Sequence, residues 1–191
     1  MKRALIALLS LITGCAYIPS PVVAPFADGS HWVLMEPLRY RLKDTEHVIE
    51  VPKGFVTDFA SVPRVAWSVM SPYDEHGRAG IVHDWLYWEQ SCSRKQADKI
   101  MKLGMIETRV SHANRAIIYR ALRLAGNGAW NENAQERKMG LPRVISARHP
   151  PIPADAVWPE YRNRLYVEGE RPPVASHKPK YCSAVDDILE S

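Results

Sequence analysis

Residues 78–90, RAGIVHDWLYWEQ, open the helical part of this chain and decide its fold. The stretch contains no proline and predicts a helix. Gly80, His83, Asp84 and Tyr87 follow one another at i, i+3, i+4 and i+7, so they lie on one face of that helix. A histidine, a carboxylate and a phenol therefore share one face, and a glycine leaves room beside them.

Two more helices are predicted after this stretch. An S-x-x-Q capping box at Ser93 opens a second helix that runs to about Thr108. Ser111 caps a third helix, whose apolar stripe ends at Gly126. Because the connection at residues 91–92 is short, the first two helices are expected to be antiparallel neighbours.

Asp98 lies on the core side of the second helix, close to the apolar residues Met101 and Met105. A buried carboxylate without a partner is costly, and His83 on the neighbouring helix is the expected partner. A histidine oriented by an aspartate can act as a general base near neutral pH. The same pair can equally be a structural hydrogen bond in the core, and both interpretations stay open.

The segment before the helices predicts a small antiparallel sheet within residues 31–57. Two strands, at residues 32–42 and 46–51, flank a turn at residues 43–45, and residues 55–57 form a third short strand. The predicted fold class is therefore α+β: a small antiparallel sheet, a helical hairpin, a third helix and a Pro-rich C-terminal tail.

Asp58 follows the third strand and is a second candidate for function. Its structural interpretation is an Asx-type turn brace or a helix N-cap. Its functional interpretation is a metal ligand beside His83 and Asp84, because oxygen ligands favour calcium or magnesium over zinc. We name Asp84 and Asp58 as the candidate metal ligands and calcium as the candidate cofactor.

The N-terminus has the layout of a bacterial lipoprotein signal. Lys2 and Arg3 precede an apolar run at residues 4–12, and Thr13-Gly14-Cys15 follows. The run is too short to span a bilayer as a helix, which needs ~20 apolar residues. Diacylation of Cys15 would tether the protein to a membrane outside the cytoplasm. An ordinary cleaved signal or a short membrane anchor is the alternative.

Lipidation of Cys15 would leave Cys92 and Cys182 either as a disulfide or as two free thiols. Ala16 stands where an inner-membrane retention signal has an aspartate, so the outer membrane, facing the periplasm, is the expected location. The chain divides into a signal peptide at 1–14, a tether at 15–30, an α+β domain at 31–140 and a Pro-rich extended segment at 141–191.

The net charge of +4 includes Lys2 and Arg3, so the chain after the signal is nearer +2. This excess is too small to indicate a nucleic-acid partner. Arg115, Arg120 and Arg123 lie on one side of the third helix, where they face either solvent or anionic lipid.

Three stretches of the sequence resemble a known family. The run of residues 51–64, VPKGFVTDFASVPR, together with His83-Asp84-Trp85-Leu86-Tyr87 and Ala97-Asp98, is similar to the domain of unknown function thirteen-fifty-three (DUF1353). The resemblance extends over roughly residues 30–130 and brings no established activity. It implies a phage or prophage origin and, with the lipoprotein signal, a role in altering the host envelope.

A second, local resemblance is to the phospholipase A2 active site. It implies that His83 is the base that activates water, that Asp84 binds calcium, and that Asp98 and Tyr87 orient the histidine. The glycine-rich calcium loop and the paired cysteines of that family have no counterpart before His83 in this sequence.

Two functional hypotheses follow. In the first, the protein is a membrane-anchored lipoprotein with a non-catalytic interaction role at the envelope, where an envelope protein or phospholipid is its partner. In the second, it is a calcium-dependent ester hydrolase that uses a dyad of His83 and Asp98.

Overall fold

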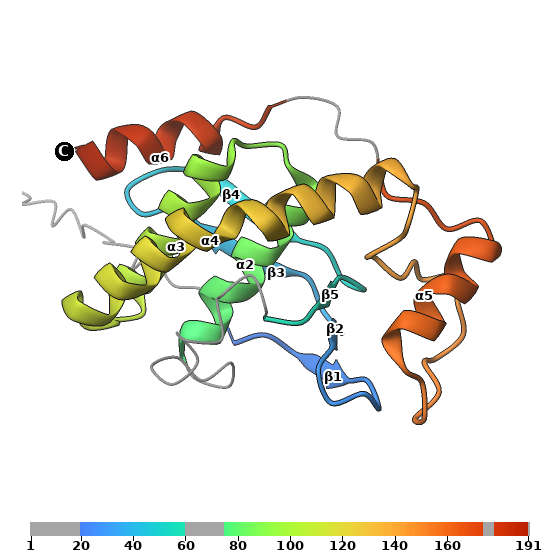
Figure 1. The fold of residues 1–191 in the computed structure, drawn as a ribbon. Helices are drawn as coiled ribbons and strands as arrows, with labels where there is room; N and C mark the ends of the chain where they lie inside the picture. Colours follow the sequence, from blue (N-terminus) through green and yellow to red (C-terminus); the bar gives the residue numbers. More distant parts are fainter. Residues whose placement is uncertain (1–19, 60–74, 174–177, 191) are drawn as a thin grey trace, which may run out of the picture.

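The computed structural model describes residues 20–59, 75–173 and 178–190 (Figure 1). Strands and helices are both present in these ranges, with the strands first in the chain, so the α+β class is confirmed. The signal at 1–14, Cys15 and the motif residues 60–64 lie outside the described residues.

Two small antiparallel sheets form the β layer. The first contains three strands in the order β1-β2-β5, and the second pairs β3 with β4. Their bounds are β1 Val23–Pro25, β2 Trp32–Leu34, β3 Leu38–Arg41, β4 Val48–Val51 and β5 Val56–Thr57. Buried and exposed residues alternate along β3 and β4, as the two-residue period of a strand requires. Tyr40 and Ile49 are thus paired across the strands and both buried.

The single strand predicted at residues 32–42 is in fact two strands in different sheets. Residues 35–37 separate β2 from β3, and this link ends in Pro37. Because proline has no backbone N–H to donate, it interrupts a ladder of strand hydrogen bonds. β2 therefore pairs with β1 and β5, while β3 pairs with β4 in the second sheet.

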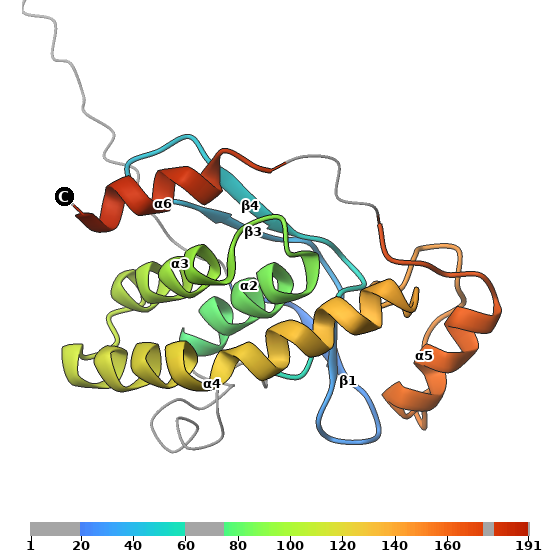
Figure 2. The ribbon, with the colours of Figure 1, turned by 45° about the horizontal axis from the view of Figure 1, so that its top comes forward.

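Three helices pack beside one another, as the turned view in Figure 2 shows, and α2 lies against the strands β4 and β5. They are α2 (Glu75–Glu89), α3 (Arg94–Glu107) and α4 (His112–Lys138). The capping box predicted at the start of α3 is present: Ser93 Oγ accepts from the Gln96 backbone N–H, and Gln96 Oε1 accepts from the Ser93 backbone N–H at 3.1 Å. This cap begins α3 only four residues after α2 ends, which makes the two helices direct neighbours.

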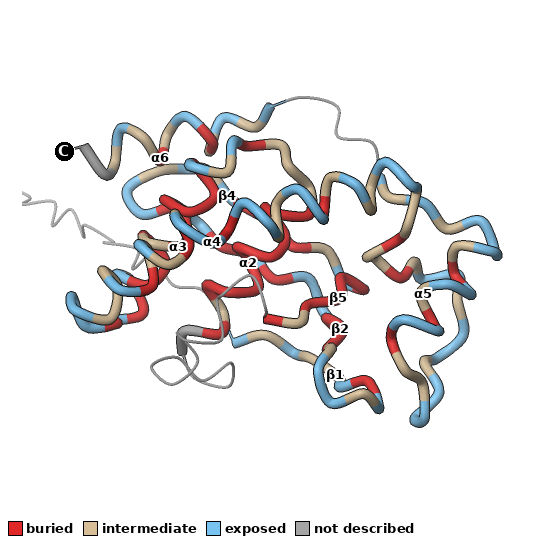
Figure 3. The backbone as a smooth tube through the Cα atoms, in the orientation of Figure 1, coloured by how far each residue is buried: buried red, intermediate tan, exposed pale blue. Residues whose placement is uncertain are grey.

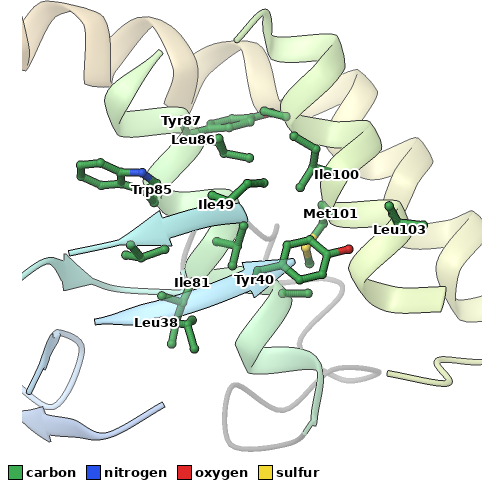
Figure 4. Close-up of a cluster of buried hydrophobic side chains, with 14 of the residues drawn as sticks. Leu38, Tyr40, Ile49, Ile81, Trp85, Leu86, Tyr87, Ile100, Met101 and Leu103 are labelled. Atoms are coloured by element: carbon green, nitrogen blue, oxygen red, sulfur yellow. The ribbon is translucent and has the colours of Figure 1, made fainter. Parts of the chain in front are cut away.

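The main core lies between the β3–β4 pair and helices α2 and α3. Figure 3, coloured by burial, shows many of the buried residues in this region. Figure 4 shows side chains from all of these elements meeting in one cluster: Leu38, Tyr40, Ile49, Ile81, Leu86, Ile100 and Met101. Every member is at most 2% exposed, so the polar residues of α2 and α3 that share this interior are held in a dry environment.

The third helix is longer than predicted. Gly126 was expected to end it, but α4 continues to Lys138. Gly140, with φ at 78°, follows the C-cap residue Met139 and takes the left-handed conformation that favours glycine. Gly126 has a different function, because a Cβ atom there would overlap the Tyr87 hydroxyl. It allows α4 to approach α2 closely.

Both segments outside the predicted domain contribute to the fold. The predicted tether includes β1, which pairs with β2, so only the part before Val23 can act as a linker. The C-terminal segment was predicted to be extended, but it forms α5 (Trp158–Val167) and α6 (Tyr181–Glu190). Pro159 occupies the second position of α5, where a missing N–H costs no helical hydrogen bond. The prolines of the C-terminal segment are therefore compatible with helices.

Candidate functional site

Three of the predicted site residues meet at the contact between α2 and α3. His83 Nε2 lies 3.0 Å from Asp98 Oδ1, and Tyr87 Oη donates to the same oxygen at 2.6 Å. The rings of His83 and Tyr87 are neighbours, with centroids 4.1 Å apart. All three residues are 0% exposed. We call His83, Tyr87 and Asp98 the buried polar cluster.

Two arginines neutralise the carboxylate of this cluster. Arg123 Nη1 on α4 donates to Asp98 Oδ2 at 2.5 Å, and Arg94 Nη1, one turn earlier on α3, approaches the same oxygen at 3.4 Å. Burial alone would raise the pKa of Asp98. The hydrogen bonds from His83 and the other donors outweigh burial and hold the pKa below its ordinary value. Asp98 is therefore an ionised carboxylate that connects α2, α3 and α4.

Tyr87 is held in its neutral form. Its burial and the adjacent Asp98 charge both raise the pKa of the phenol far above its ordinary value. The hydroxyl thus always has a proton to donate to Asp98. Gly126 leaves the space this hydroxyl occupies, which explains why a glycine stands inside α4.

The second nitrogen of His83 has no hydrogen-bond partner among the described residues. Because Asp98 Oδ1 is a carboxylate acceptor, Nε2 is the ring nitrogen that donates in this contact. Nδ1, on the other side of the ring, is buried and keeps no partner among the described residues. This is the orientation that a histidine base needs, although the side chain has no exposed surface through which a substrate could reach it.

The two candidate metal ligands belong to different surroundings. Asp84 Oδ2 accepts from Thr57 Oγ1 at 2.5 Å, which attaches α2 to the end of β5. Asp58 is next to Thr57 in the chain but forms an ion pair with Arg143, with 3.2 Å between Oδ1 and Nη2. Within the described ranges, no three His, Cys, Asp or Glu side chains gather closely enough to hold a metal ion. Calcium binding stays a prediction.

A second polar region, missed by the sequence analysis, lies where α4 faces α5. It is a cavity of about 420 Å³. We call it the α4–α5 cavity, and the residues that define it are Asp58, Glu132, Asn133, Arg143, Trp158 and Arg162. Asp58 precedes the others by more than seventy residues in the chain. No periodic pattern within one element could indicate such a site.

Cys92 and Cys182 form a disulfide that joins the α2–α3 connection to α6. Two contacts support the same attachment: Lys99 Nζ and Gln96 Nε2 of α3 donate to Asp186 of α6 at 2.7 and 2.9 Å. The C-terminal helix is therefore fixed to α3.

None of the helices in the described ranges is long and apolar enough to cross a bilayer.

The central part of this chain matches a known protein family. Residues 32–122 match a family model described as "Protein of unknown function (DUF1353)". The family resemblance is confirmed. The DUF1353 match begins at β2, ends within α4 and includes the whole buried polar cluster. Of the residues that define the α4–α5 cavity, only Asp58 lies inside it. No curated protein and no solved structure matches the chain.

Proposed function

We propose that this chain is a lipid-anchored, phage- or prophage-related protein of the bacterial envelope that acts by binding rather than by catalysis. The observation that carries the proposal is the closure of the buried polar cluster. His83, Tyr87 and Asp98 are 0% exposed, and both oxygens of Asp98 already accept hydrogen bonds from protein donors. A closed network around a fully engaged carboxylate is typical of a structural brace between helices.

Anchoring through Cys15 would hold the domain close to the membrane. Val23, the first residue of β1, follows Cys15 by eight positions. A fully extended segment of that length spans at most about 28 Å. The domain would then bind partners near the membrane surface, consistent with a phospholipid or an envelope protein as the partner.

Metabolic labelling with a palmitate analogue tests the anchor. The full-length chain is expected to incorporate the label and to fractionate with the outer membrane. Cys15→Ala should abolish both, whereas the double variant Cys92→Ala/Cys182→Ala should still be labelled. Equal labelling of the wild type and Cys15→Ala would contradict lipidation at this residue.

A second candidate function is ester hydrolysis with His83 as the base. One observation favours it: Asp98 occupies His83 Nε2 and leaves Nδ1 without a partner among the described residues. In the phospholipase A2 resemblance the histidine activates water and Asp84 holds calcium. A structural histidine ordinarily satisfies both ring nitrogens, so the open Nδ1 is a reason to test this function.

The two functions are separated by one assay. The full-length chain in detergent is incubated with phospholipid, with calcium or with a chelator, and released fatty acid is measured. The binding role predicts no calcium-dependent release. Release that disappears in His83→Gln would establish the hydrolase instead. Glutamine keeps an N–H donor near Asp98 but cannot act as a base, and circular dichroism verifies that the variant is folded.

A further inference from the structure

The α4–α5 cavity contains hydrogen-bond donors that the protein itself does not satisfy. Asn133 is 5% exposed, and its Oδ1 accepts from Arg143 Nη1 at 2.8 Å. That contact fixes the amide and leaves Nδ2 without a partner among the described residues. Trp158 is 4% exposed, and its indole N–H has no partner there either. Neither nitrogen is among the fully enclosed side-chain atoms that lack a partner, and both residues line the cavity, so both donors are accessible to a ligand that accepts hydrogen bonds.

The same cavity offers acceptors. Glu132 is exposed at its rim and forms no ion pair with the described residues. Glu136 also lines the cavity, and Arg162 holds both of its oxygens at 2.7 Å from Nη1 and Nη2. Carboxylates fixed in this way accept hydrogen bonds in a defined geometry. The cavity thus presents donors and acceptors together.

The charges of the cavity argue against an anionic ligand. Arg143 donates to the Val56 carbonyl, Asn133 and Asp58. Arg162 donates to the Pro142 carbonyl and to Glu136. Both guanidinium groups are therefore already engaged within the protein, and a phosphate or carboxylate would have to displace these partners.

An ammonium ligand fits poorly for the opposite reason. It could pair with Glu132, but it has only donors and could accept no hydrogen bond from Asn133 Nδ2 or from the Trp158 indole. A neutral ligand with several hydroxyl groups can donate to the carboxylates and accept from these two donors. The cavity volume of about 420 Å³ lies within the range of small-ligand sites, roughly 300–1,000 Å³.

We propose that the α4–α5 cavity binds a neutral saccharide unit, with Asn133 and Trp158 as donors and Glu132 as an acceptor. The site is separate from the buried polar cluster and requires neither His83 nor a lipid on Cys15. It therefore goes beyond the proposed function, and the absence of saccharide binding would leave the labelling and hydrolysis results untouched.

Nuclear magnetic resonance tests the site directly. The full-length chain in detergent, labelled with nitrogen-15, is titrated with maltose and with the N-acetylglucosamine disaccharide. The chain has six tryptophans, so the indole signal of Trp158 is assigned with Trp158→Phe. Saturable movement of that signal at millimolar concentrations of either saccharide is the expected result.

Two isosteric variants locate the contacts. Asn133→Asp keeps the acceptor for Arg143 but removes the amide donor, and Glu132→Gln removes the carboxylate. Each is expected to weaken saccharide binding about tenfold, the effect of losing one good hydrogen bond. Asn163→Asp, at an exposed position of α5, is the matched control and should bind like the wild type.

The contrary results are equally clear. No movement of the Trp158 signal up to tens of millimolar of either saccharide would overturn the proposal. The proposal would also be overturned if the Trp158 signal moved equally in the wild type and in folded Asn133→Asp and Glu132→Gln variants. Inorganic phosphate and lysine methyl ester are titrated in parallel, and a response to either one in place of the saccharides would overturn the neutral-ligand assignment.

Discussion

The buried polar cluster and the α4–α5 cavity hold polar side chains in opposite ways. In the cluster, Asp98 accepts from donors on three helices and no member is exposed. In the cavity, Glu132 and the amide nitrogen of Asn133 keep capacity for further hydrogen bonds. Polar residues that stabilise this fold are thus distinguished from those that are available to a ligand.

The two regions also differ in how the chain assembles them. His83 and Asp98 are 15 residues apart, on helices joined by a short connection. Asp58 and Arg143, the ion pair that lines the cavity, are 85 residues apart. A local pattern can predict the first contact, whereas the second exists only after the C-terminal segment has folded back onto β5 and α4.

Removal of the central carboxylate should have the largest effect. Asp98→Ala would leave the Tyr87 hydroxyl and His83 Nε2 buried without a partner and would unpair Arg123. The expected loss is about 3–5 kcal/mol in the free energy of unfolding. Urea denaturation followed by circular dichroism measures it, with the exposed Asp187→Ala as the control. A loss near that of the control would mean that the cluster does not brace the helices.

A matched glycine pair tests the packing of the same cluster. Gly126→Ala places a Cβ atom against the Tyr87 hydroxyl and should cost about 1–3 kcal/mol of unfolding free energy. Gly128→Ala, two residues later in α4, meets nothing and should stabilise the helix by about 0.5–1 kcal/mol. Thermal unfolding of both variants gives the signs. The same sign for both would show that Tyr87 moves freely and that its contact with Asp98 is not closely packed.

Helical periodicity was sufficient to bring His83, Tyr87 and Asp98 together, because each lies on a regular helix and the connection at residues 91–92 is short. The same reasoning misjudged Gly126. A glycine at the end of an apolar stripe ordinarily indicates a C-cap. Here it marks a close approach to Tyr87, a contact between helices that no spacing within α4 reveals.

The C-terminal segment could not be predicted for a related reason. Its prolines favoured an extended chain, yet Pro159 fits the first turn of α5, and Trp158 packs with Phe26 from the β1–β2 connection. Its structure comes from contacts with distant residues rather than from its own pattern. The wall of the cavity formed by Trp158 and Arg162 therefore had no signal in the sequence.

The smallest expected effect concerns the attachment of that wall. Asp28 Oδ2 accepts from the Trp158 backbone N–H at 2.9 Å, and Oδ1 accepts from the Ser30 N–H at 2.8 Å. Burial opposes the charge of Asp28, but these backbone hydrogen bonds outweigh it and lower its pKa from 3.8 to about 2. Because the folded-state pKa lies below the unfolded one, Asp28 stabilises the fold above about pH 4 and loses this contribution as the pH falls to about 2.

Asp28→Asn should therefore cost about 1–2 kcal/mol of unfolding free energy at neutral pH, and the difference from the wild type should shrink between about pH 4 and about pH 2. Urea unfolding across this range measures it, and Asp155→Asn, at an exposed position before α5, is the control. A difference that is constant with pH would mean that the Asp28 charge does not hold the start of α5. In that case the position of Trp158 would depend on its packing with Phe26 alone, and the cavity would be less rigidly built than the buried polar cluster.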